Sequence, residues 1–168
     1  PDGADRQIYL DTVGMLSRFV RECQQIYGTV CFDRSTWVWR ILCGRIYRIG
    51  ALEFERKTVE KQIPQTDLAA GTPILSVHIP SDADLSEASL RQTYASAREF
   101  FARLEPGMPP RLLVCDSWML APGLKELLPP DSRILRFAAD YDLYAQNPAD
   151  TSPYRWVFHS PDGKWENF

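Results

Sequence analysis

The chain has 168 residues, 45% of them hydrophobic and 12% aromatic, which is enough apolar material for one domain with a buried core and too much for a disordered chain. The formal net charge of −3 and the scattered arginines lack the basic face that nucleic-acid binding requires. No apolar run reaches the roughly 18 residues of a membrane-spanning helix. We therefore expect neither a nucleic-acid partner nor a membrane partner.

The N-terminal part predicts two helices. Apolar residues follow a helical stripe from Asp5 to Tyr27, and the stripe ends at a glycine. Asp33 is a good N-cap for a second, shorter helix, which we expect to stop at Gly44.

From Tyr47 to Lys57 the pattern changes to alternation. Leu52 and Phe54 fall on one face of the expected strand, and Glu53 and Glu55 fall on the other. This alternation is typical of a strand with one buried face and one solvated face.

A strand–helix–strand unit follows, from Pro73 to Ser117. The β-branched run at 74–79 predicts a buried strand, Ser86 is a plausible N-cap for a helix that continues to residue 104, and 112–115 is a second apolar strand. A right-handed crossover makes the two strands parallel, so that both end at the same edge of the sheet. Open α/β sheets bind ligands at such an edge.

The C-terminal part predicts three further elements. A short helix is expected through Leu124 and Leu127, and a fourth strand at 134–138. Segments 154–159 and 164–168 flank a Ser-Pro-Asp-Gly turn, which indicates a β-hairpin.

Polar side chains gather where the two parallel strands end. The first strand and its loop deliver His78 and Ser81, and the second is followed by Asp116, Ser117 and Trp118. Ser117 lacks the G-x-S-x-G flanks of a hydrolase nucleophile, so a hydrolase that uses Ser117 or Asp116 is the weakest alternative.

His78 is the candidate general base. Ser76 and His78 share one face of their strand, and Glu53 and Glu55 share that face if the strand at 47–57 pairs with it. A histidine beside a carboxylate can accept a proton near neutral pH. The alternative is a structural histidine and a pair of solvated glutamates.

The loop after the first strand carries Asp82 and Asp84 before the helix begins. These residues suit helix capping, and their charges disfavour a pyrophosphate at this helix end. The sequence also contains neither a G-x-G-x-x-G nor a G-x-x-x-x-G-K-[ST] motif, so nucleotide binding has no motif support.

The four cysteines have no paired spacing, and the chain has only two histidines, so no metal site is expected. Free cysteines without a pattern suit a reducing compartment and predict a cytoplasmic protein. The sequence begins without methionine, and we expect residues 1–168 to form a single domain taken from a longer protein.

Three segments carry a family resemblance: RIGALEFE at 48–55, SVHIPSDADL at 76–85 and CDSWMLAP at 115–122. Their order and spacing resemble a bacterial acyltransferase-like family, the GNAT-like C-terminal domain, over roughly residues 5–168. The resemblance implies an α/β (α+β) fold of the N-acetyltransferase type: a mixed sheet with a central β-α-β crossover and N-terminal helices. Two departures stand out: Asp116 replaces an expected histidine, and 79–84 replaces the glycine-rich coenzyme A segment of N-acetyltransferases.

The resemblance implies an acyltransferase that moves an acyl group to an amine or hydroxyl on a small molecule. The co-substrate would be acyl-CoA or acetyl-CoA, or a thioester on an acyl carrier, with no covalently bound cofactor. His78 would be the base, supported by Glu53 or Asp116, and the substrate-binding candidates are Glu55, Ser76, Ser81, Ser117 and Trp118. The competing hypothesis is a non-catalytic module that binds a small ligand or an N-terminal partner domain. A gap between the two parallel strand ends would admit a pantetheine arm and favour the enzyme.

Overall fold

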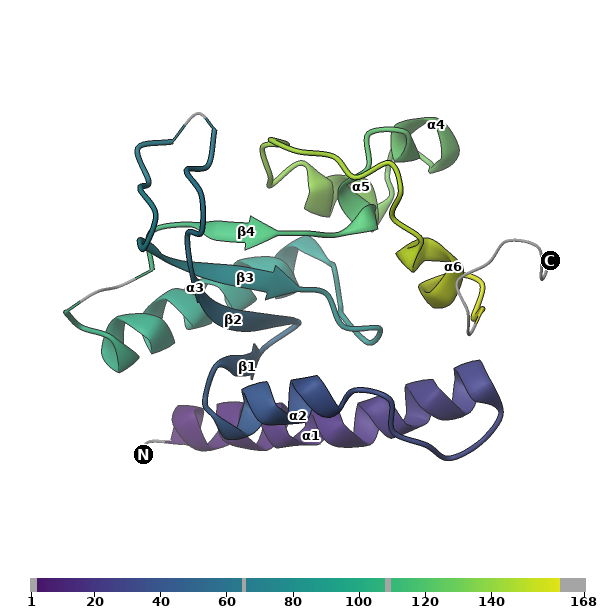
Figure 1. Cartoon of the computed structure of the whole chain (residues 1–168), viewed down its shortest axis with the longest axis horizontal. Coiled ribbons are helices and arrows are strands. Elements are labelled where there is room, and N and C mark those ends of the chain that lie inside the picture. The colour runs from purple at the N-terminus through teal and green to yellow at the C-terminus, as the bar shows by residue number, and fades with distance from the viewer. Residues whose placement is uncertain (1–2, 65, 108–109, 161–168) are drawn as a thin grey trace.

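The computed structural model describes residues 3–64, 66–107 and 110–160 of the chain. A four-stranded mixed sheet forms its centre, with α3 (Glu87–Leu104) against one face and the N-terminal helices beside β1, as Figure 1 shows. Within the described residues, no helix has both the length and the apolar character needed to cross a bilayer.

The strands are β1 (Ile46–Ile49), β2 (Leu52–Thr58), β3 (Pro73–His78) and β4 (Leu113–Cys115), in that order across the sheet. The pairs β1–β2 and β2–β3 are antiparallel, and β3–β4 is parallel. The mixed sheet with its β3–α3–β4 crossover is therefore confirmed.

A hairpin divides the segment that the alternation predicts as one strand. Gly50 has a φ of +58°, which a side chain rarely tolerates. A Cβ there would also collide with Oγ1 of Thr93, and this oxygen accepts a hydrogen bond from the N–H of Ala51 at 2.9 Å. The tight turn therefore requires glycine and is tied to α3.

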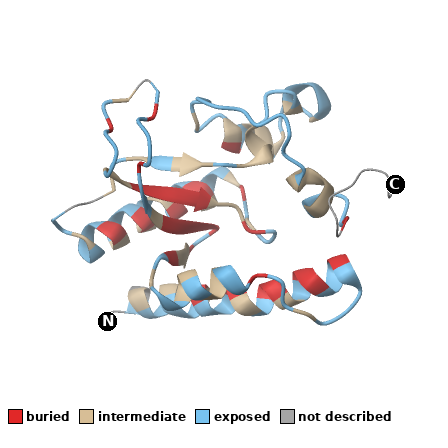
Figure 2. Ribbon diagram, in the orientation of Figure 1, coloured by how far each residue is buried: buried red, intermediate tan, exposed pale blue. Residues whose placement is uncertain are grey.

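The main core lies between the sheet and α3. Leu52, Phe54, Leu75 and Val77 face Phe101, which is 1% exposed. Burying one such side chain contributes about 1.5–3 kcal/mol. Figure 2 shows that the buried residues concentrate in the two central strands, β2 and β3.

Helices α1 (Gly3–Tyr27) and α2 (Ser35–Leu42) close the β1 side of the sheet. The N–H of Arg48 on β1 donates to Oγ1 of Thr12 on α1 at 2.9 Å, and Met15 and Phe19 pack against Ile46. Both helices were predicted, but the N-cap of α2 is Arg34, whose side chain makes no capping bond, and not Asp33.

The expected strand at 134–138 is wrong, because this segment is the helix α5 (Arg133–Ala138). Ser132 caps it by accepting a hydrogen bond from the N–H of Ile134 at 3.2 Å, and Phe137 is fully buried. A short apolar run does not distinguish a strand from a buried helix, and here the cap and the packing of Phe137 decide.

The expected hairpin at the C-terminus is also wrong in its described part. Residues 152–156 form the helix α6 (Ser152–Trp156), with Pro153 in its first turn, where proline is well tolerated. The second arm, 164–168, lies outside the described residues. The short helix α4 (Leu124–Leu127) is confirmed, and a 3₁₀ turn, η1 (Trp118–Leu120), precedes it.

Candidate functional site

A pocket of about 410 Å³ opens where β3 and β4 end. The last pair of the parallel ladder is Val77 with Cys115, and the segments that follow it, 78–81 and 116–119, both line the pocket. The rest of the wall comes from Glu53 on β2, from Ala83 and Leu85 in the loop before α3, and from seven residues in or next to α1, α2 and α6: Arg18, Phe19, Glu22, Arg34, Trp37, Ser152 and Trp156. An opening thus lies where the two parallel strands end, and residues in or next to three helices contribute to its wall.

His78 contacts Glu55 at this pocket, with Nε2 of the ring 3.0 Å from Oε2 of the carboxylate. Register pairs Glu55 with Ser76, so the contact is diagonal, within reach of a long side chain in an antiparallel pair. Trp37 packs edge-on against the His78 ring, with centroids 4.8 Å apart. Because Nε2–H donates to the carboxylate, Nδ1 is the nitrogen that carries the lone pair.

Glu55 is an ionised, buried carboxylate. Burial favours the neutral acid, but the hydrogen bond from His78 and the charges of Lys57 and Arg40 outweigh it and lower the pKa of Glu55 to about 2. The side chain is 2% exposed, with Lys57 Nζ at 3.3 Å and Arg40 Nη1 at 3.4 Å. Glu55 does not line the pocket, so it positions the His78 ring from behind.

Glu53 lies in the pocket wall and is not solvated. It is 2% exposed, with Arg18 Nη1 at 2.5 Å and Arg48 Nη1 at 3.8 Å. Burial raises the pKa of Glu53 although Arg18 opposes the rise. The predicted solvated face is therefore wrong for both Glu53 and Glu55, because α1 and α2 cover that face of the sheet.

Arg18 begins a chain of buried charges along the pocket. Its Nε lies 3.0 Å from Glu22 Oε1, and Glu22 also pairs with Arg34 and accepts a hydrogen bond from Oγ of Ser81. Breaking a buried pair typically costs about 3–5 kcal/mol, because the remaining charge stays desolvated. This network ties the β3 loop to both N-terminal helices.

The two aspartates of the loop before α3, Asp82 and Asp84, are each paired with an arginine. Burial would raise the pKa of Asp82, but the hydrogen bond from Arg48, at 2.9 Å, outweighs it and lowers that pKa. Asp84 accepts from the N–H of Ser86 at 3.0 Å and lies 3.1 Å from Arg133; the Ser86 bonds lower its pKa. Both remain carboxylates close to the start of α3.

The other predicted site residues divide into two groups. Asp116, Ser117 and Trp118 line the pocket, and Oγ of Ser117 accepts from the N–H of Met119 at 3.2 Å, which caps η1. Ser76 is buried beside Glu55 in the β2–β3 ladder and is outside the pocket wall. The structure therefore brings together all the predicted residues except Ser76, with Glu55 behind His78.

Seven residues that the helical segments contribute to the pocket wall were not predicted from the sequence: Arg18, Phe19, Glu22, Arg34, Trp37, Ser152 and Trp156. One signal was available, since Arg18 and Glu22 are four residues apart and flank Phe19 on the buried stripe of α1. Trp37 on a short apolar helix predicts only a core residue.

A second, larger pocket of about 1040 Å³ lies along the outer edge of β4 and shares Asp116 and Met119 with the first. Tyr94 and Tyr141, whose hydroxyl oxygens are 3.3 Å apart, stand in its wall. Burial, followed by the nearby charge of Asp116, raises the pKa of the Cys115 thiol to about 12, which makes it a poor nucleophile. No group of His, Cys, Asp or Glu side chains in the described part of the chain is arranged to hold a metal ion.

Residues 46–168 match the family model described as the GNAT-like C-terminal domain. Similar solved structures include an acyltransferase in complex with CoA and 10C-teicoplanin, which is 28% identical with a TM-score of 0.79. Another is an acyltransferase in complex with decanoyl-CoA and teicoplanin, 29% identical with a TM-score of 0.77. A variant acyltransferase in complex with octanoyl-CoA is 27% identical, with a TM-score of 0.79.

The alignments with the first and second of these structures cover 94% of this chain and 47% of the other. The alignment with the octanoyl-CoA complex covers 90% of this chain and 46% of that acyltransferase. The chain thus spans about half the length of these acyltransferases, and the likeness includes most of the N-terminal helices, which the family model leaves out. The comparison with curated proteins gave no match.

Proposed function

Because this chain belongs to the GNAT-like C-terminal domain family, we propose that it transfers an acyl group from acyl-CoA to an amine or hydroxyl on a small molecule. His78 is the general base, and Glu55 is the positioning residue behind it. The joint wall that α1, α2, α6 and both strand ends form around one pocket supports the proposal that the chain is a single domain.

The contact between His78 and Glu55 carries this proposal. A buried carboxylate with a pKa of about 2 holds Nε2 of the ring at 3.0 Å. The arrangement fixes the tautomer and stabilises the imidazolium that forms when Nδ1 accepts a proton. It replaces the predicted support from Glu53, which pairs with Arg18 instead.

The reaction needs two proton transfers: one from the acceptor to His78, and one from His78 to the leaving thiolate. The amine or hydroxyl of the acceptor attacks the thioester carbonyl carbon while Nδ1 of His78 takes its proton. A C–N or C–O bond forms, the C–S bond breaks, and the leaving thiolate takes the proton back as the free thiol. A positioned base of this kind typically contributes about 10²–10⁴-fold in rate.

The loop before α3 carries Asp82 and Asp84 at the place where N-acetyltransferases have the glycine-rich coenzyme A segment. Both are compensated by arginines: Asp82 by Arg48 and Asp84 by Arg133. This pairing removes much of the repulsion that a phosphate would meet. Acyl-CoA therefore remains the proposed donor, as in the solved acyltransferases, and a carrier-bound thioester is the alternative.

The experiment is acyl transfer from decanoyl-CoA to a panel of primary amines, followed by mass spectrometry of the products. His78→Asn should lower the rate at least about 100-fold. His159→Asn is the matched control, because His159 is the other histidine of the chain and is exposed, with a φ of +56° that asparagine tolerates. Equal rates for His78→Asn and wild type would remove His78 from the mechanism. Binding of decanoyl-CoA without any turnover would favour the non-catalytic module.

A further inference from the structure

Arg34 presents an unused hydrogen-bond donor at the pocket. Its side chain is 10% exposed, Nη1 pairs with Glu22, and Nε lies 3.5 Å from Oδ1 of Asp33. Nη2 is buried and has no hydrogen-bond partner among the described residues. A buried donor without a partner costs free energy that a ligand oxygen would recover.

Two aromatic rings hold the Arg34 guanidinium in place. Its central carbon lies 4.8 Å from the Phe19 ring centroid and 4.7 Å from that of Trp156. Both rings therefore contact the guanidinium, and Nη2 is left without a hydrogen-bond acceptor among the described residues. Trp156 also lines the pocket and is 39% exposed on the short helix α6, so a ligand in the pocket contacts the ring that lies next to the guanidinium.

Arg34 and His78 stand at opposite ends of an aromatic wall. Phe19 lies 6.1 Å from Trp37, and Trp37 lies 4.8 Å from His78, measured between ring centroids. A ligand that reaches from His78 to Arg34 must therefore lay an apolar or aromatic body along Trp37. The reacting group and the oxygen that binds Nη2 belong at opposite ends of this ligand.

The charges favour one carboxylate over a phosphate group. Glu22, Glu53 and Asp33 already pair with the arginines around the pocket, and a polyanion would be repelled by them. Burial raises the pKa of Glu53, so this carboxyl gives up its negative charge more readily than a solvated one. The pocket can therefore take one further negative charge, and one carboxylate on the acyl acceptor supplies it.

We propose that Arg34 selects the acyl acceptor by donating from Nη2 to a carboxylate of a small amine with an aromatic or apolar body. This inference rests on the proposed acyl transfer, since it describes the acceptor of the same reaction. Arg34 lies upstream of residues 46–168, the part that matches the family model. The residue that selects the acceptor thus lies at the start of α2, whereas the general base, His78, lies on β3 of the sheet.

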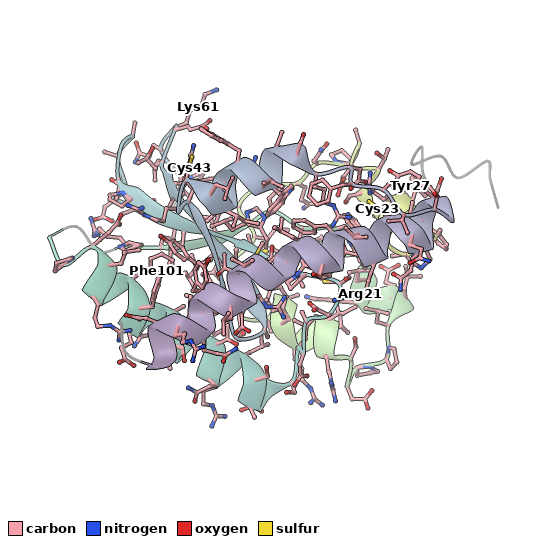
Figure 3. The ribbon with its side chains drawn as sticks, turned by 90° about the horizontal axis from the view of Figure 1, so that it is seen from below. Arg21, Cys23, Tyr27, Cys43, Lys61 and Phe101 are labelled. Carbon is pink, nitrogen blue, oxygen red and sulfur yellow. The ribbon has the colours of Figure 1, made fainter. Side chains whose placement is uncertain are left out.

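The test compares 3-phenylpropanoate with 3-phenylpropanamide, which have the same shape but differ in charge. Binding is followed by tryptophan fluorescence, because Trp37 and Trp156 line the pocket, and by calorimetry. The wild type should bind the carboxylate roughly 10- to 100-fold more tightly than the amide, and Arg34→Gln should bind both equally. Arg21→Gln is the matched control, since Arg21 is exposed on the same helix as Phe19 (Figure 3), and it should keep the preference.

Equal affinities in the wild type, failure of the wild type to bind either probe, or a preference that survives Arg34→Gln would each overturn the inference. The wild-type comparison decides the matter even if Arg34→Gln does not fold. A second experiment measures decanoyl transfer to 4-(aminomethyl)benzoate and to 4-(aminomethyl)benzamide, in which the amine and the carboxylate or amide stand at opposite ends of an aromatic ring. Transfer to both at equal kcat/KM would overturn the carboxylate subsite and leave the proposed acyl transfer intact. A carboxylate preference in binding, lost in Arg34→Gln, with no transfer to any amine, would support the subsite and refute the acyl transfer.

Discussion

Replacing Glu55 with glutamine removes the carboxylate that holds the His78 ring and leaves a side chain of nearly the same size. The pKa of Glu55 falls from an ordinary value of 4.5 to about 2 in the folded chain. A difference of this size corresponds to about 3 kcal/mol of folded-state stability at neutral pH. Because the folded pKa lies below the unfolded one, this contribution is present above about pH 4.5 and is lost as the pH falls toward 2. Between pH 7 and pH 3.5 the stability difference between wild type and Glu55→Gln should therefore shrink by roughly 1.4 kcal/mol.

Urea unfolding at a series of pH values measures this difference, with tryptophan fluorescence as the signal, since Trp37 packs on His78. Glu87→Gln is the control, because that side chain is 76% exposed at the start of α3, and its effect should stay within about 0.5 kcal/mol at every pH. A stability difference between wild type and Glu55→Gln that stays constant from pH 7 to pH 3.5, or grows, would show that Glu55 is not stabilised as a carboxylate in the folded chain.

Gly50→Ala should destabilise the chain by at least about 1 kcal/mol, because it combines a positive φ with a collision at Thr93; urea midpoints equal to wild type would contradict the tight turn. Phe101→Ala should cost about 3–5 kcal/mol in thermal or urea unfolding, and a loss below 1 kcal/mol would mean that the cavity collapses. Iodoacetamide at about pH 8 should modify the exposed Cys43 well before Cys115, whose pKa is raised to about 12. Mass spectrometry of digests measures the order of labelling, and labelling of Cys115 before Cys43 would mean that β4 detaches from the edge of the sheet.

The elements that could be predicted are those with strong local signals. The period of α1, the cap of α3 at Ser86 and the two apolar strands of the crossover depend on neighbours within a few residues. The crossover rule then placed His78 and Asp116 at one edge of the sheet, where the pocket is found.

The burial and the ion pairs of the two glutamates on β2 could not be predicted from the sequence. Alternation with apolar residues is typical of a solvated face, but Glu53 and Glu55 are each 2% exposed. Their burial depends on α1 and α2, which precede β2 by 10 residues or more and bring Arg18 and Arg40 to these carboxylates. Such pairs leave no local pattern, because each arginine alone resembles a surface residue.

Local patterns in the sequence predicted a β-α-β crossover with a histidine at the strand ends, because periodicity, caps and crossover handedness follow from backbone sterics and side-chain burial. The mixed sheet was predicted from the family resemblance. Which carboxylate supports His78, and how α1 and α2 contribute to the pocket wall, depend instead on the tertiary packing. A diagonal pair across two strands and a guanidinium between two aromatic rings, as for Glu55 and Arg34, arise from the packing of distant segments. The same packing explains why 134–138 is a helix, since a short apolar run is compatible with either structure until a neighbouring surface buries it.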